Sequence, residues 1–175
     1  MKTLYFSFLL LNFCFFLSCQ SKTTFENPRT VEDFKLDSYL GTWYEIARTD
    51  NRFEKGLEQV TANYTLNEDG TVKVLNKGFS PEKDKWKQAE GKAKFREERS
   101  DGKLKVSFFG PFYADYNIME LDENYQYALI IGDNLDYLWI LSRETSIPED
   151  VKENYLKKAK ELDFDTEKLI WVNHK

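Results

Sequence analysis

The sequence predicts an all-β fold: an eight-stranded antiparallel up-and-down barrel, with one α-helix packed on its outside near the C-terminus and a short final strand. Three observations lead to this prediction. Apolar and polar residues alternate repeatedly from Gly41 onward, turn residues interrupt the alternation at short intervals, and one segment with helical periodicity follows the last run. With 41% hydrophobic, 16% aromatic and 31% charged residues among 175, the composition is that of a globular protein with one folded domain.

Eight runs of residues have the two-residue period of a half-buried strand. The period is clearest in the fifth run, where Leu104, Val106 and Phe108 alternate with polar residues. The segment Asn67-Glu68-Asp69-Gly70 between the second and third runs is a typical hairpin turn. The runs are Gly41–Arg48, Glu58–Leu66, Thr71–Gly78, Trp86–Arg96, Lys103–Phe109, Tyr113–Leu121, Tyr125–Gly132 and Tyr137–Ser142.

Strands that each pair only with the next one leave two exposed edges, unless the first strand also pairs with the last. Closure into a barrel removes both edges, and an eight-stranded barrel is just wide enough inside to hold one small ligand. A flat sandwich of two sheets is the alternative. A single amphipathic helix after the strands favours the barrel, because such a helix can pack on the outside of one wall.

The predicted helix follows the last of these strands. Ser146 and Glu149 have the spacing of a capping box, and Pro148 falls in the first turn. One face of the segment is apolar, and the other carries lysines that we expect to face water. The apolar stripe consists of Val151, Tyr155, Ala159 and Leu162, and the short apolar run after the helix is Leu169–Val172.

The first residues have the pattern of a secretory signal, with Lys2 at the start and an apolar run over Leu4–Leu17. Ser18 and Cys19 at the end of this run resemble the cleavage site of bacterial lipoproteins, in which the cysteine becomes the acylated first residue of the mature chain. Cleavage by an ordinary signal peptidase is the alternative, and the bulky Phe16 makes it the poorer one.

We therefore expect three parts in the chain: a signal peptide over residues 1–18, a lipidated tether over residues 19–30 and a barrel domain over residues 31–175. The residue after Cys19 is Gln20 and not an aspartate. By resemblance to lipoproteins of didermal bacteria, this favours the outer membrane. The acyl chains on Cys19 would hold the barrel at that membrane.

The charge of the chain and its few histidines and cysteines exclude several functions. The 25 basic and 30 acidic residues give a formal charge of −5, so no electrostatic footprint for nucleic acid is present. The single histidine, His174, lies next to the C-terminal residue, and both cysteines lie within the first 19 positions. These residues cannot assemble a metal site or a Cys-His nucleophile. We expect no cofactor, no metal and no enzymatic activity.

Three stretches resemble the signatures of the lipocalin family, in the same order and spacing. They are GTWYEIAR at Gly41–Arg48, LDENYQYALI at Leu121–Ile130 and WILSR at Trp139–Arg143. Two further stretches, RFEKGLEQVTANY at Arg52–Tyr64 and KVSFFGPFYADYNI at Lys105–Ile118, resemble the bacterial branch of that family, the outer-membrane lipoproteins. The resemblance implies the eight-stranded barrel already predicted, with a ligand cavity inside it.

The signature residues have a structural role in this interpretation. Trp43 lies on the first strand and Arg143 at the end of the last, and these strands are neighbours in a closed barrel. The guanidinium can then lie on the indole face and plug one end of the barrel. Gly41, Asp122 and Tyr125 complete the signature residues that the resemblance assigns to structure.

If Trp43 points inward, alternation predicts which side chains line a cavity. Small and large residues are interspersed on this face, which leaves more volume than a face of large residues alone. Tyrosine hydroxyls near the mouth would suit a polar head group, and Glu45 and Glu120 share the inward parity. The cavity-lining candidates are Ala62, Tyr64, Val74, Ala93, Phe95, Val106, Phe108, Tyr116, Ile118, Ala128, Ile130, Tyr137 and Trp139.

The function that this interpretation favours is storage or transport of one amphipathic lipid, a fatty acid or lysophospholipid, for maintenance of the cell envelope. The partners are then the lipid and, through Cys19, the membrane. The sequence leaves open whether the protein forms a homodimer. Two alternatives remain: an envelope scaffold whose barrel is filled with side chains, and a carrier of another hydrophobic ligand.

Overall fold

The computed structural model describes residues 24–174, so the predicted signal peptide and Cys19 lie outside the described residues. Each predicted run forms a strand, with ends shifted by no more than a few residues. The strands are β1 (Gly41–Arg48), β2 (Glu58–Leu66), β3 (Val72–Ser80), β4 (Lys85–Phe95), β5 (Lys103–Phe109), β6 (Phe112–Leu121), β7 (Tyr127–Ile131) and β8 (Leu138–Ser142).

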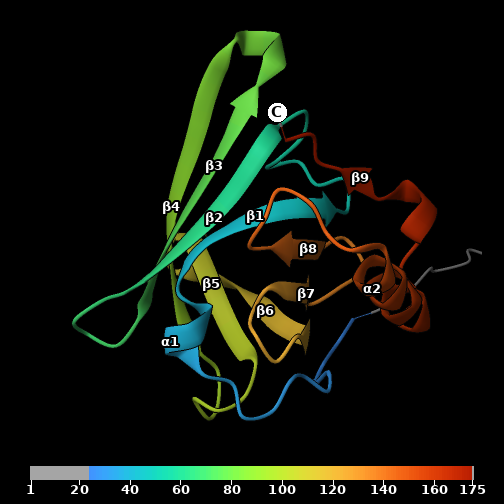
Figure 1. Ribbon diagram of the computed structural model, residues 1–175. Helices are drawn as coiled ribbons and strands as arrows, with labels where there is room; N and C mark the ends of the chain where they lie inside the picture. The colour runs from blue at the N-terminus through green and yellow to red at the C-terminus, as the bar shows by residue number, and fades with distance from the viewer. Residues whose placement is uncertain (1–23, 175) are drawn as a thin grey trace, which may run out of the picture.

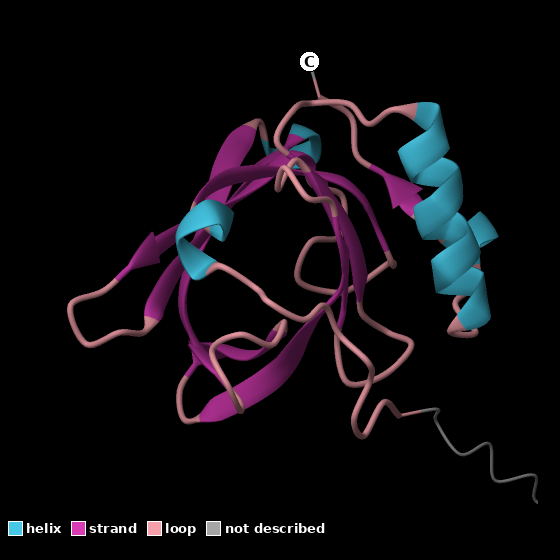
Figure 2. Ribbon diagram, turned by 60° about the horizontal axis from the view of Figure 1, so that its bottom comes forward, coloured by secondary structure: helices cyan, strands magenta, loops and turns pink. Residues whose placement is uncertain are grey.

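The strands close into a barrel, which confirms that prediction over the flat sandwich. Each strand pairs antiparallel with the next, and β1 pairs with both β2 and β8, so that Tyr44 lies opposite Thr61 on one side and Ser142 on the other. Figure 2 shows the strands arranged around a common axis, and the interior that they enclose, where inward side chains lie, is called the bore here. Closure gives both outer strands a partner and leaves the bore as the place where inward side chains meet.

The helix α2 (Glu149–Glu161) packs outside the barrel, as predicted (Figures 1 and 2). It begins after Pro148, and no side chain caps its first turn, so the predicted capping box is wrong. Ser146 instead accepts a hydrogen bond on its carbonyl from the Ser142 hydroxyl, at 2.9 Å. The expected apolar stripe is present, with Tyr155 and Ala159 buried.

Short elements complete the described chain. The helix α1 (Leu36–Tyr39) precedes β1, and β9 (Ile170–Trp171) pairs with the end of β1, at Ala47 and Arg48. Two 3-10 turns, η1 (Pro81–Lys83) and η2 (Thr166–Lys168), lie in the connections. No helix among residues 24–174 is both long and apolar enough to cross a membrane.

Two apolar cores lie on the two sides of the barrel wall. The inner core fills part of the bore and includes Trp43, Ile118 and Ile130. The outer core lies between the wall and α2 and includes Leu129 and Ile140. Neighbouring residues of β7 therefore belong to different cores, which is the physical meaning of the two-residue period.

The up-and-down topology gives the barrel two unlike ends. The end that holds α1 also holds the β2–β3, β4–β5 and β6–β7 connections, and we call it the closed end. The other end, called the open end here, holds the β1–β2, β3–β4, β5–β6 and β7–β8 connections. The β3–β4 hairpin extends beyond the rest of the barrel (Figure 1), because β4 pairs with β5 only over Lys92–Phe95.

Candidate functional site

The closed end is plugged by Trp43 and Arg143, as the sequence predicted. The guanidinium carbon of Arg143 lies 3.9 Å from the centre of a Trp43 ring. The guanidinium also donates to the carbonyls of Tyr125, Thr42, Ser38 and Leu40, at 2.8–3.2 Å. The indole N–H of Trp43 donates to the Tyr39 carbonyl at 2.8 Å. One cation thus holds α1, β1 and the β6–β7 connection together.

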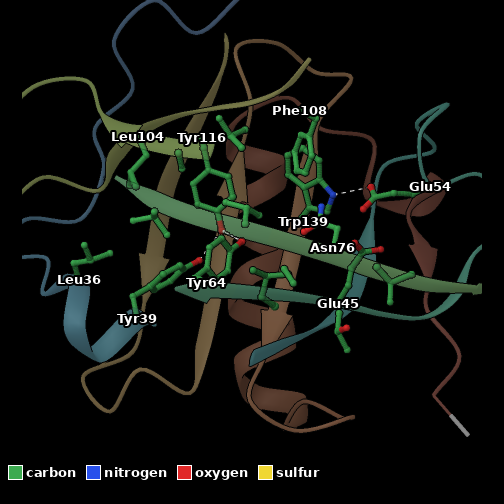
Figure 3. A pocket seen from close by; sticks show the side chains of 18 residues that line it. Leu36, Tyr39, Glu45, Glu54, Tyr64, Asn76, Leu104, Phe108, Tyr116 and Trp139 are labelled. Carbon is green, nitrogen blue, oxygen red and sulfur yellow. Dashed lines mark hydrogen bonds between the residues drawn. The ribbon is translucent and has the colours of Figure 1, made fainter. Parts of the chain in front are cut away.

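Three tyrosines lie next to this plug, inside the bore: Tyr39 and Tyr64 are buried, and Tyr116 is partly buried. The Tyr116 hydroxyl is hydrogen-bonded to the hydroxyls of Tyr39, at 2.6 Å, and Tyr64, at 2.8 Å. Burial raises the pKa of all three hydroxyls, so they stay neutral donors and acceptors at physiological pH. Tyr64 and Tyr116 were expected near the mouth, and this expectation is wrong because both lie toward the closed end, beside α1 (Figure 3).

A narrow, mostly apolar cavity extends from these tyrosines toward the open end (Figure 3). The volume of this cavity is about 80 Å³. A long acyl chain therefore fits only if lining side chains turn to other rotamers. The lining residues are Leu36, Tyr39, Glu45, Glu54, Val60, Thr61, Ala62, Tyr64, Val72, Val74, Asn76, Ala93, Leu104, Val106, Phe108, Tyr116, Trp139 and Leu141.

The structure brings most of the predicted lining residues to this cavity. These are Ala62, Tyr64, Val74, Ala93, Val106, Phe108, Tyr116 and Trp139. Ile118, Ala128 and Ile130 point into the bore but are close-packed and fully buried away from the cavity.

Two other predicted lining residues lie elsewhere. Phe95 packs on Phe34, whose ring also contacts Tyr39 and Tyr125, so the segment before α1 fills this part of the bore. Tyr137 precedes β8 at the open end and stacks on Trp139, outside the cavity lining. Inward parity therefore does not distinguish a packed position from one that borders empty space.

A buried polar cluster forms the open-end part of the cavity. Glu45 accepts a hydrogen bond from Arg48 at 2.7 Å, with both side chains almost fully buried. Glu54 accepts from the Trp139 indole at 3.0 Å (Figure 3). It also accepts from the Asn51 amide at 2.6 Å. Burial raises the pKa of Glu45 well above its usual range, the Glu54 charge adds to this effect, and Arg48 opposes it.

A bulge in β1 creates this cluster. The β1–β8 register shifts between Glu45 and Ala47, so that Ile46 and Ala47 both belong to the outer core. Arg48 consequently lies close enough to Glu45 for an ion pair, which strict alternation would prevent. Arg48 also donates to the carbonyls of Glu54 and Leu57, and this fixes the β1–β2 connection over the open end.

A second bulge corrects the expectation for Glu120. The β6–β7 register shifts between Ile118 and Glu120. Glu120 therefore leaves the inward face and forms an ion pair with Lys158 of α2, at 3.3 Å, outside the barrel. The two carboxylates that shared inward parity in the sequence lie on opposite sides of the wall.

Sequence reasoning missed several cavity residues. Asn76 continues the alternation of Val72 and Val74, but it is polar, and its buried Oδ1 has no hydrogen-bond partner. Leu36 lies in the segment before the barrel, and Glu54 lies in a connection, where a strand period has no meaning. Alternation could have found Asn76, and likewise Val60, Val72, Leu104 and Leu141, which share the parity of predicted lining residues on the same strands.

The arrangement is suited to binding an apolar molecule. Its walls are hydrocarbon, and a few fixed polar groups lie at its two ends, which is the usual composition of a ligand pocket. Among residues 24–174, no three histidine, cysteine or acidic side chains gather to hold a metal ion.

An eight-stranded barrel, plugged at one end by a stacked tryptophan and arginine and hollow toward the other, is the architecture of the lipocalins. A family model described as a lipocalin-like domain matches residues 34–174. The chain belongs to this family.

Relatives and solved structures agree with this assignment. The chain is 52% identical to the outer membrane lipoprotein Blc of Vibrio cholerae, over 84% of this chain and 86% of that protein. It is 50% identical to the outer membrane lipoprotein Blc of Escherichia coli K12, over 89% of this chain and 88% of that protein. The insecticyanin of the tobacco hornworm Manduca sexta has the same fold, with a TM-score of 0.70, 21% identity and 85% of each chain covered.

Proposed function

We propose that this protein is an outer-membrane lipoprotein that binds one single-chain amphipathic lipid, a fatty acid or a lysophospholipid, and stores or carries it for maintenance of the cell envelope. The names of the bacterial relatives support the location and the lipid anchor. Ser18-Cys19 after the apolar run is the sequence feature that agrees with those names.

The observation that carries the lipid-binding proposal is the apolar cavity. Between the tyrosines and the polar cluster, its walls are side chains such as Val74, Ala93 and Val106. Each methylene that an acyl chain buries there contributes about 0.8 kcal/mol, so a long chain needs no ionic contact to bind usefully.

The two polar regions of the cavity favour one orientation of the ligand. At the closed end the three tyrosine hydroxyls are already hydrogen-bonded to one another. Toward the open end, Glu45, Glu54 and the unpartnered Asn76 Oδ1 offer acceptors, which suit the hydroxyl or ammonium donors of a lysophospholipid head group and not the carboxylate of an ionised fatty acid. We therefore place the acyl end toward the closed end and the head group toward the open end.

The test compares two alanines of the bore. Ala93 lines the cavity, whereas Ala128 is fully buried in close-packed surroundings. Ala93→Leu is expected to occupy cavity volume and to weaken fatty-acid and lysophospholipid binding by tenfold or more, about 1.4 kcal/mol, with little change in melting temperature. Ala128→Leu is the control, and overpacking should cost it about 1–3 kcal/mol of stability.

The measurement combines lipid titration with thermal melts on protein stripped of lipid. Equal destabilisation by both variants, with no lipid bound by the unchanged protein, would establish the filled-barrel scaffold instead. A larger hydrophobic ligand that displaces the lipid with higher affinity would establish a different cargo.

A further inference from the structure

Large apolar side chains are exposed at the open end, on three different hairpins. Phe109 and Phe112 are 69% and 78% exposed, on either side of the β5–β6 turn. Trp86 of the β3–β4 hairpin is 57% exposed, and Phe53 of the β1–β2 connection is 53% exposed. Most of the exposed large apolar side chains among residues 24–174 therefore gather around the mouth of the cavity.

Basic side chains lie beside these rings. The Arg52 guanidinium is 4.7 Å from the centre of the Phe53 ring, and the Lys94 ammonium is 4.8 Å from the centre of the Tyr113 ring, next to Phe112. The segment 77–87, which contains Trp86, has four lysines and two acidic residues and is therefore basic. The chain as a whole carries a formal charge of −5. The lysines are Lys77, Lys83, Lys85 and Lys87, and the acids are Glu82 and Asp84.

One of the exposed rings is next in the chain to a residue that lines the cavity. Phe108 lines the cavity, and the next residue, Phe109, faces solvent at the end of β5. The cavity lining and the exposed rings are therefore neighbours along β5, at the open end.

We infer that the open end of the barrel docks on the surface of a phospholipid bilayer containing anionic lipids, with Phe109 and Phe112 inserted among the acyl chains. Aromatic rings beside lysines and arginine suit the boundary between head groups and acyl chains, where ring and cation each find a favourable neighbour. The rings stand on separate hairpin tips around an opening, which fits a deformable lipid surface better than a flat protein face.

Docking adds a membrane contact to the proposed function that does not depend on acylation of Cys19. A lipid leaving the bilayer would enter the cavity past Phe108 without crossing water. Docking can fail while the cavity still binds lipid, and the converse also holds, so the two proposals are tested separately.

The experiment uses the chain from Gln20 onward, which contains no cysteine and so no acylation site. All of the described strand pairing and both apolar cores lie within residues 24–174, so this chain retains the packing of the barrel. We expect it to sediment with vesicles of phosphatidylcholine and phosphatidylglycerol. Binding should be weaker to pure phosphatidylcholine, because that membrane has no net negative charge to attract the lysines and arginine. High salt should also weaken binding, because it screens the attraction between these cations and the anionic lipids.

Variants locate the contact. Phe109→Ser combined with Phe112→Ser is expected to lower vesicle binding by tenfold or more and to leave lipid binding in the cavity unchanged. Leu66→Ser is the matched control, because Leu66 is also exposed, at 42%, but lies at the closed end. Its vesicle binding should equal that of the unchanged chain.

A fluorescent probe adds a measurement of depth. A side chain added at Gly110, the tip of the β5–β6 hairpin, meets no atom within 4 Å, so Gly110→Cys can carry an environment-sensitive dye. Glu68→Cys in the β2–β3 turn is the control at the closed end. Vesicles should shift the emission of the dye at position 110 to the blue and leave that at position 68 unchanged.

Three results would overturn the inference: no vesicle binding by the unchanged chain, equal loss of binding by Leu66→Ser, or equal emission shifts at both dye positions. A dimer that Phe112→Ser dissociates, in a chain that does not bind vesicles, would assign the exposed rings to a second copy of the chain.

Discussion

At the scale of single residues, the Tyr116 hydroxyl carries an unusual share of the polar interactions within the bore. Among the described residues, it is the only hydrogen-bond partner of two buried hydroxyls, those of Tyr39 and Tyr64. Since hydrogen bonds inside an apolar bore cannot be replaced by bulk water, the loss of one hydroxyl leaves its neighbours unsatisfied.

Tyr116→Phe is therefore expected to lower the free energy of unfolding by about 1–3 kcal/mol, with little change in shape. Chemical denaturation measures the loss. Tyr113→Phe is the control, because the Tyr113 ring is exposed at the open end, and it should change stability by less than about 0.5 kcal/mol. Equal stability of both variants would show that the buried hydroxyl network contributes nothing.

The same tyrosines predict how stability changes at alkaline pH. Burial raises the pKa of Tyr39, Tyr64 and Tyr116 above the ordinary value of 10.0 in the folded protein. Below pH 10 the hydroxyls are protonated in both states and pH has no effect through them. Above it the unfolded chain loses protons that the folded protein retains, so the free energy of unfolding falls as pH rises.

The measurement is an alkaline titration followed by tyrosinate absorbance and by circular dichroism. Exposed tyrosines should ionise first, and the buried ones only together with unfolding. Ionisation of every tyrosine near pH 10 in a fully folded protein would contradict the raised pKa values.

At the scale of secondary-structure elements, Arg143 joins segments that are distant in the chain. Its contacts reach the carbonyls of Ser38 and Leu40 beside α1, Thr42 in β1, and Tyr125. Arg143→Ala is expected to lower stability by about 1–3 kcal/mol, since both the stacking on Trp43 and several hydrogen bonds are lost.

Arg143→Lys should restore little of this stability, because an ammonium cannot reach several carbonyls and cover an indole face at once. Lipid affinity of either variant should be nearly unchanged, since Arg143 does not line the cavity. A large loss of lipid binding at an unchanged melting temperature would instead make the plug part of the binding site.

The junction of β4 and β5 depends on Gly91. A Cβ added there would lie 2.8 Å from the Ser107 carbonyl oxygen and 2.8 Å from the Phe108 ring. Gly91→Ala is expected to cost about 1–3 kcal/mol, because a backbone oxygen cannot turn aside as a side chain can. Gly110→Ala, whose added Cβ has open space, should melt like the unchanged protein, and equal melting of both variants would refute the steric explanation.

At the scale of the whole molecule, the prediction concerns the anchor. Cys19→Ala is expected to abolish incorporation of labelled palmitate and to reduce recovery in the outer-membrane fraction of the cell, without changing the melting temperature of the barrel. The unaltered melting temperature is expected because Cys19 lies outside the strands of the barrel, the first of which begins at Gly41. Palmitate incorporation into the variant would mean that another residue is acylated.

Much of the fold could be predicted from the sequence because barrel strands leave a local signal. A residue such as Leu104 or Val106 shows by its parity alone which side of the wall it faces. The bulges leave no such signal, since a register shift at Glu45 or Ile118 depends on how two strands meet. This is why Arg48 was not anticipated beside Glu45, and why Glu120 was expected inside.

The barrel, the outer helix and the stacking of Arg143 on Trp43 could be predicted from the residues alone, because they follow from periodicity and from the pairing of the first strand with the last. Tertiary structure alone decided where the bore is filled and where it is hollow. That outcome depends on the height of each side chain along the barrel axis and on segments outside the strands. Phe34 enters the bore from the segment before α1, and Glu54 enters it from the β1–β2 connection. Neither residue belongs to a strand, so the two-residue alternation could not predict its position.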